Sequence, residues 1–312
     1  MHHEKPSSLH SNPFQLPGRW YRGNLHTHSK MSDGAHHPNQ VVKWYAENGY
    51  DFIAFTEHDR WTDAEVARQL SNGLLVLPGV ELSVGLSRQC SPMHVVVIGD
   101  VNGLPMNGGL TPTQALTQSW QSGAFAFLAH PHWSGLSLEE LAVIDSIPAI
   151  ESFNYASDLE NHKGLATIYW DDILGRGQAT FGVATDDAHF HEADHGGGWV
   201  MVKASRFSAE ALIAALRAGH FYSSSGPEIY DIRMVDDQLH VKTSPASAIY
   251  WVSSGCFGWH AHAAPGQTIE SAAFYIPSGL KWIRIEVCDP QRRWAWSNPI
   301  FLMDQGSEQH PN

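Results

Sequence analysis

Short apolar segments alternate with helical segments from residue 24 to about residue 223. Apolar segments of strand length occupy residues 51–56, 74–80, 94–99, 124–129, 149–153 and 179–184. Because strands and helices take turns so regularly, this part of the chain predicts a mostly parallel sheet, either wound or closed into a barrel.

Helix boundaries can be placed between these segments. Three pairs fit capping boxes, in which two side chains bond the free N–H groups of the first helical turn: Thr62 with Glu65, Thr111 with Gln114, and Ser137 with Glu140. Two prolines suit a first helical position, Pro38 and Pro112. Three glycines suit the residue after a helix, Gly49, Gly123 and Gly219.

The pattern changes after residues 221–230. Short alternating segments without a helical period follow, at 231–235, 238–243, 248–254 and 282–287. They predict a small β-sandwich joined to the α/β part. The expected organisation is a mobile N-terminal segment (1–19), an α/β domain (20–226) and a β-sandwich domain (227–312), with the tryptophans of the last domain mainly in its core.

Composition narrows the class of protein. The 312 residues are 43% hydrophobic and 16% charged, which is ordinary for a folded protein. No apolar segment is long enough for a membrane span or a signal peptide, and Cys90, Cys256 and Cys288 have no metal-binding or disulfide spacing. We expect a cytoplasmic protein without a membrane partner. The net charge of −13 opposes an extended nucleic-acid footprint.

The stretch "NLHTHSKMSDG" (24–34) contains the first candidate metal ligands. Side chains two apart on a strand point the same way, so His26 and His28 can hold one ion, and Asp33 can add a carboxylate oxygen. In a chain with 20 histidines such a pair is weak evidence by itself.

Later segments bring the same chemistry to the same end of the sheet. Histidines and carboxylates follow or close most apolar segments, namely His58, Glu81, His130, Asp187 and His189, and His94 stands at the start of one. The carboxyl ends of strands form the site in barrel and open α/β folds, so these side chains should converge. Histidine and carboxylate ligands without cysteine suit Zn, Mn or Fe.

The motifs "HTHSKMSDG", "TEHD", the lone Glu81, "HPH" and "DDAH" resemble those of the PHP (polymerase and histidinol phosphatase) superfamily over roughly residues 20–226. The end of that region and the later "AWSNPI" resemble the CehA/McbA carbaryl-hydrolase branch. The resemblance implies a distorted (β/α)7 barrel with two or three divalent ions.

The same resemblance distributes the ligands among three sites. His26, His28, Glu81 and Asp187 would hold the first ion; Glu81, His94 and His130 the second; Asp33, His58 and His189 the third. Asp33 stands where many relatives have histidine, and Asp187 rather than Asp186 is aligned with the family aspartate.

The function expected from these motifs is metal-dependent hydrolysis of a small-molecule ester by a metal-bridging hydroxide, with Glu81, Asp187 and His189 as the catalytic residues. The leading hypothesis is a phosphoesterase that acts on phosphomonoesters or nucleotide-type phosphodiesters. A carboxyl or carbamate ester hydrolase is the alternative, and a silent metal-stabilised scaffold comes third. Neither a nucleophile elbow nor a P-loop is present.

Residues near the expected mouth add finer candidates. Arg60, His132 and His195 are the candidate substrate contacts. Glu57 and Asp59 are candidates for orienting His58, and Glu151 is either a similar support or an ordinary strand-end residue. Cationic residues at the mouth would favour phosphate, and apolar or aromatic ones the other esters. The oligomeric state is not readable from the sequence.

Overall fold

The computed structural model describes residues 12–71, 73–100, 103–106, 108–235 and 238–302. The helices are η1 (Pro13–Gln15), α1 (Pro38–Glu47), α2 (Ala64–Leu70), α3 (Pro112–Gln121), α4 (Leu138–Ala142), α5 (Tyr155–Asn161), α6 (Thr167–Gly175) and α7 (Ala209–Arg217). None of the described helices is long and apolar enough to cross a bilayer.

The strands of the first part are β1 (Arg19–Asn24), β2 (Phe52–Ala54), β3 (Leu75–Leu77), β4 (Gly79–Leu86), β5 (Pro92–Ile98), β6 (Phe125–Leu128), β7 (Ala149–Asn154), β8 (Phe181–Thr185), β9 (Trp199–Ala204) and β10 (Phe221–Ser224). Those of the second part are β11 (Ile229–Val235), β12 (Gln238–Ala246), β13 (Ala248–Val252), β14 (Gly258–His262), β15 (Ile269–Tyr275), β16 (Trp282–Cys288), β17 (Trp294–Ser297) and β18 (Ile300–Phe301).

The expected parallel sheet is only partly present. β1, β2 and β3 pair in parallel, as do β6, β7 and β8, but β5 runs antiparallel to both β4 and β6, and β9 runs antiparallel to β1. Only residues 87–91 separate β4 from β5, which is too short for the crossover that a parallel pair needs. The prediction of a mostly parallel sheet was therefore wrong in this segment.

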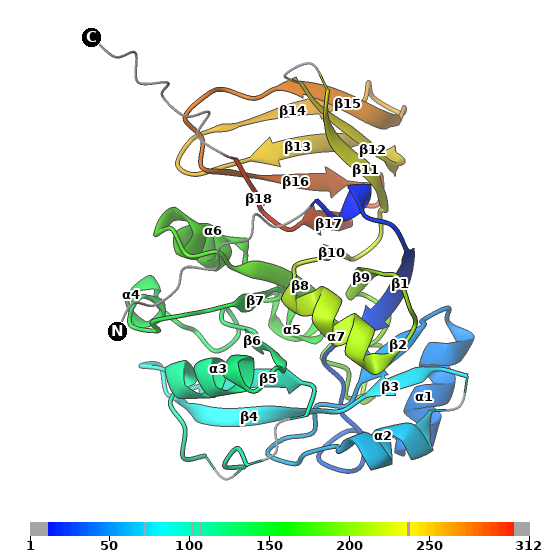
Figure 1. The fold of residues 1–312 in the computed structure, drawn as a ribbon, viewed down its shortest axis with the longest axis vertical. Coiled ribbons are helices and arrows are strands. Elements are labelled where there is room, and N and C mark those ends of the chain that lie inside the picture. The colour runs from blue at the N-terminus through cyan, green and yellow to red at the C-terminus, as the bar shows by residue number, and fades with distance from the viewer. Residues whose placement is uncertain (1–11, 72, 101–102, 107, 236–237, 303–312) are drawn as a thin grey trace.

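Helices cover the outer faces of these strands (Figure 1). α3 contacts β5 and β6, α7 contacts β9, and α6 contacts β7. The capping boxes at Thr111 and Ser137 are confirmed, as are the two prolines at first helical positions. The box predicted at Thr62 was wrong, because the Asp63 side chain accepts the N–H of Val66 and caps α2 instead.

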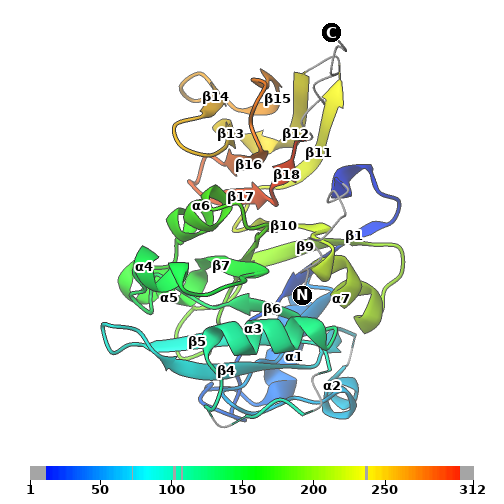
Figure 2. The same cartoon turned by 60° about the vertical axis from the view of Figure 1, so that its left-hand side comes forward.

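The C-terminal strands are not a separate sandwich. One sheet runs in the order β14-β13-β16-β17-β10-β9-β1-β2-β3, so β10 pairs with β9 on one side and with β17 on the other. The sheet β11-β12-β15 packs against the part of this long sheet formed by β13, β16 and β17, and the two share an apolar core (Figure 2). Two sheets pack against each other here, but one of them includes β9 and β10 of the α/β part, so the separate β-sandwich domain predicted after residue 226 is not confirmed.

Side chains also join the two parts. The guanidinium of Arg284, on β16, is buried, donates to Asp171 of α6 over 2.8 Å, and lies 4.2 Å from the ring centroid of Trp170. Asn298 Oδ1 accepts the N–H of Gly182 in β8 over 3.1 Å. Trp251, Trp282 and Trp296 are core residues as predicted, whereas Trp259 is exposed.

The N-terminal segment differs from the expectation. Residues 1–11 lie outside the described residues, but residues 12–19 of the predicted mobile segment are packed. Gln15 Nε2 donates to Asp231 Oδ1 of β11 over 2.8 Å, and the ring of Phe14 lies 5.1 Å from that of Trp20. These contacts hold η1 against β11 of the three-stranded sheet and against β1.

Candidate metal centre

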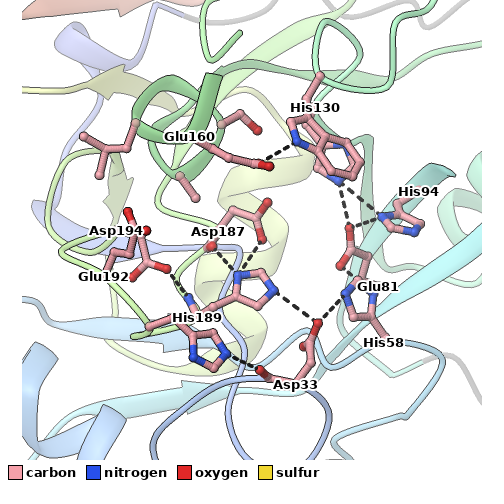
Figure 3. Close-up of a pocket in the computed structure, with 15 residues that line it drawn as sticks. Asp33, His58, Glu81, His94, His130, Glu160, Asp187, His189, Glu192 and Asp194 are labelled. Atoms are coloured by element: carbon pink, nitrogen blue, oxygen red, sulfur yellow. Dashed lines mark hydrogen bonds and ion pairs between the residues drawn. The ribbon is translucent and has the colours of Figure 1, made fainter. Parts of the chain in front are cut away.

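The structure brings all nine predicted metal ligands together. They come from the ends of β1, β2, β6 and β8, from β4 and β5 themselves, and from the turn after β1. Figure 3 shows seven of them around one cavity: Asp33, His58, Glu81, His94, His130, Asp187 and His189. His26 and His28 lie beneath them and are fully buried.

Two histidines and two carboxylates converge at the floor of the cavity. The Nε2 atoms of His26 and His28 each lie 3.2 Å from Glu81 Oε2 and 3.2 Å from Asp187 Oδ1. All four atoms are buried and have no hydrogen-bond partner among the described residues. Buried polar atoms are normally paired, so four unpaired atoms facing one another need an explanation.

A divalent metal ion fits this set. Metal–nitrogen and metal–oxygen distances of about 2.0–2.2 Å place tetrahedral ligand atoms roughly 3.3 Å apart, close to the separations of 3.2 Å found here. An ion would also provide the partner that each atom lacks and would balance the two buried carboxylates.

The other oxygen of Glu81 faces a second set. Glu81 Oε1 lies 2.8 Å from His94 Nδ1 and 3.1 Å from His130 Nε2, and these two nitrogens are 3.3 Å apart. One carboxylate therefore joins two neighbouring groups of candidate ligands, in agreement with the bridging position expected for Glu81.

A third set lies nearer the solvent. Asp33 Oδ2 is 3.3 Å from His58 Nε2 and 3.5 Å from His189 Nε2, and the side chain of Asp33 is half exposed. This group is more open than the other two, which have side chains at most 12% exposed. We expect an ion here to be held less tightly.

Glu151 supports the deepest set from below. Its Oε1 accepts from His26 Nδ1 over 3.0 Å, and its Oε2 accepts the N–H of His130 over 2.6 Å. Because a carboxylate only accepts, His26 must carry its proton on Nδ1 when neutral, which leaves the Nε2 lone pair facing the site. Of the two expectations for Glu151, these contacts favour a residue that orients ligands.

The two neighbouring aspartates of the "TDDAH" motif have different partners. Asp187 Oδ1 faces His26 and His28 while its Oδ2 accepts from Asn154. Asp186 is turned away and accepts the N–H groups of residues 196–198 and the hydroxyl of Tyr45. Asp187 has a φ of 54° and His130 a φ of 25°, which are strained conformations of the kind found at functional sites.

Electrostatics in the metal-free site favour protonated histidines. Burial alone lowers the pKa of His28, but the Asp187 and Glu81 carboxylates outweigh it and raise that pKa to about 9. For a carboxyl group burial has the opposite effect: it raises the pKa of Asp186 to about 6, although the N–H groups that donate to Asp186 lower it. A metal ion must therefore displace protons from the floor of the cavity.

Several finer predictions do not agree with the structure. Arg60, His132 and His195 do not line the cavity: Arg60 donates to the carbonyl of Met31, and His132 Nδ1 to that of Leu165. The ring of His195 stacks on Phe190 at 4.5 Å. Neither carboxylate predicted to orient His58 contacts it, because Glu57 accepts from Ser29 and Ser32, and Asp59 accepts the N–H of Ser83.

The cavity itself has a volume of about 340 Å³. Besides the candidate ligands, the side chains around it include Trp133, Leu159, Glu160, His191, Glu192 and Asp194. Among the described residues, no lysine or arginine lines it. Sequence reasoning missed Glu160 and Glu192, since α5 and the loop after His189 carry no motif that marks them.

Comparisons with known proteins agree with this chemistry. No family model matches the chain. A stretch of 84 residues is 34% identical to phosphoribosyl 1,2-cyclic phosphate 1,2-diphosphodiesterase of Eggerthella lenta, covering 26% of this chain and about a third (32%) of that relative.

Solved structures extend the likeness to the whole fold. A two-domain protein of Bacteroides vulgatus containing a predicted PHP-like metal-dependent phosphoesterase superposes with a TM-score of 0.50 at 16% identity, covering 96% of this chain and 99% of that one. A Bifidobacterium adolescentis protein assigned as a metal-dependent phosphoesterase covers 54% of this chain and 87% of its own at 13% identity, with a TM-score of 0.41. The fold is thus similar to that of the Bacteroides vulgatus protein, and it carries a His and carboxylate cluster that could hold a metal ion.

Proposed function

We propose that this chain is a metal-dependent phosphoesterase with a distorted PHP barrel, that it holds two or three divalent ions (Zn, Mn or Fe), and that its natural substrate is a small phosphate ester. The single observation that carries the proposal is the position of Glu81, whose two oxygens face two different groups of histidines. A carboxylate shared in this way is what two adjacent ions require.

Each residue has a role that follows from its contacts. Glu81 and Asp187 would neutralise the ions, and His26 is held in the right tautomer by Glu151. His189 donates from Nδ1 to the Asp187 carbonyl over 2.9 Å, so its Nε2 is directed to Asp33 and is available to an ion or a proton. When bound, the ions would lower the pKa of a water molecule to about 7 and balance negative charge on the ester oxygens.

One observation favours a second candidate, a carboxyl or carbamate ester hydrolase of the CehA/McbA type. The described cavity lining has no lysine or arginine to bind phosphate, while Trp133 and Leu159 offer apolar surface. Phosphate remains the leading choice because the adjacent, overlapping groups of candidate ligands can face several phosphate oxygens at once, whereas a carbonyl presents one.

The deciding experiment combines metal content with substrate choice. The purified protein is analysed for bound metals, reconstituted with Zn, Mn or Fe, and assayed on p-nitrophenyl phosphate, bis-p-nitrophenyl phosphate and a naphthyl carbamate. Two or three ions with phosphate ester turnover are expected. Ions with turnover of the carbamate alone would replace the proposal by the second candidate, and ions with no turnover would leave the metal-stabilised scaffold.

A further inference from the structure

The wall of the cavity carries negative charge that the metal groups do not use. Three of the six lining carboxylates belong to the candidate metal groups: Asp33, Glu81 and Asp187. Asp194 is engaged by the N–H groups of His189 and Phe190. Glu160 and Glu192 remain, and neither forms an ion pair with a lysine or arginine in the described part of the chain.

Glu160 is held in place at the mouth. Its Oε2 accepts from Trp133 Nε1 over 2.8 Å, and the Trp133 ring in turn lies 5.0 Å from that of His130. Figure 3 shows Glu160 beside His130 and above Asp187, and Glu192 on the side of His189. A ligand bound by the ions would extend past these carboxylates, because both line the same cavity as the metal groups.

Such a wall discriminates by charge. A phosphate contacts the ions, which offset its charge, but a second anionic group further along the substrate would meet Glu160 and Glu192 without a compensating cation. Hydroxyl or ammonium groups would instead donate to these carboxylates, and the indole of Trp133 would cover an apolar or cationic face.

We infer that Glu160 and Glu192 determine specificity, and that the substrate is a phosphate ester whose alcohol part carries hydroxyl or ammonium donors and no second anionic group. This inference rests on the proposed function. A substrate with a phosphate at each end would not fit this preference.

Three phosphonates of equal length test the inference by binding rather than turnover. Butylphosphonate, 3-aminopropylphosphonate and 3-phosphonopropionate share the group that contacts the ions, and they differ in the charge at the far end. Calorimetric titration of the metal-loaded protein should rank the ammonium compound tightest and the carboxylate weakest, with a spread of about tenfold, the size expected for partly exposed charges.

Variants assign the effect to residues. Glu160→Gln and Glu192→Gln should each reduce the spread about threefold, while Glu270→Gln, an exposed carboxylate on β15 outside the cavity lining, should leave it unchanged. Failure of all three compounds to bind would overturn the proposed function and this inference with it. Equal affinities, or a spread that both cavity variants retain, would overturn the inference and leave the proposed function standing.

Discussion

Two His-x-His motifs of this chain have opposite surroundings. His26 and His28 have ring centroids 5.2 Å apart, and His260 and His262 on β14 have centroids 4.6 Å apart, so spacing alone does not distinguish them. The first pair is fully buried beside Glu81 and Asp187. The second pair is exposed on an edge strand, and neither residue belongs to a group of described metal-binding side chains.

A third pair shows how strand geometry matters. His130 lines the cavity, but His132 turns away to the Leu165 carbonyl, because the chain has left β6 and His130 adopts a φ of 25°. The side chains of i and i+2 share a face only in extended backbone. A site thus requires both convergence in space and carboxylates to balance the ions, and the spacing of two histidines supplies neither.

The largest expected effect comes from removing the shared carboxylate. Glu81→Gln should lower metal content and reduce turnover by roughly two orders of magnitude or more, because both deep groups lose their common anion. Elemental analysis and phosphate ester assays measure this, with Glu270→Gln as the control. Unchanged metal content in a folded Glu81→Gln protein would show that Glu81 does not bridge ions.

Matched substitutions in the two motifs test the comparison directly. His28→Asn should remove the ion of the deepest group, whereas His262→Asn should leave metal content and turnover as they are. The reason is that only His28 faces carboxylates across 3.2 Å. Circular dichroism confirms the fold of each variant, and equal metal loss in both would refute the distinction between the motifs.

The support beneath the site is expected to have an intermediate effect. Glu151→Gln keeps the shape of the side chain but weakens the acceptor for His26 Nδ1 and for the His130 N–H. Metal affinity should fall about 10- to 100-fold, as for other residues that orient ligands. Competition with a chelator gives the affinity; a value equal to that of the unsubstituted protein would make Glu151 an ordinary strand residue.

Asp33 tests the division into three groups. Asp33→Ala should release only the most exposed ion, since Asp33 lies closest to His58 and His189, is 3.6 Å from His28 Nδ1 rather than from the His28 Nε2 that faces the deepest group, and contacts neither Glu81 nor His26. One ion fewer per chain is the expected elemental analysis. Loss of every ion would show that the three groups do not bind metal separately.

The smallest effects are expected from pH. In the metal-free protein the pKa of His28 is raised from 6.5 to about 9, so its proton stabilises the fold below about pH 6.5 and this contribution disappears as pH rises through about 9. Metal binding displaces that proton, so metal affinity should rise over the same interval. As pH rises across this range, the melting temperature of the metal-free protein should fall and the metal affinity measured by titration should rise. A metal affinity independent of pH would contradict the proton displacement.

Much of the fold and the site could be predicted locally. Caps at Thr111 and Ser137, prolines at the starts of α1 and α3, and the positions of most strands depend on residues a few places apart, so they can be identified from the sequence. The nine candidate ligands could be found for a related reason, because their residue types recur in or just after successive predicted strands; in the structure these strands belong to two sheets that meet at the cavity.

Only the tertiary structure decided which contacts form between distant segments. No local pattern encodes three of these pairings. They are the antiparallel pairing of β5, the pairing of β10 with β17 that joins the two parts in one sheet, and the contact of the buried Arg284 with Asp171. The same holds for Glu160 and Glu192, which lie at the mouth because α5 and the loop after His189 border one cavity. The sequence by itself determined the chemistry of the candidate metal centre, since its ligands are histidines and carboxylates in or just after predicted strands. The wall around it was decided by packing, since Glu160 and Glu192 are exposed residues that only the fold brings to the cavity.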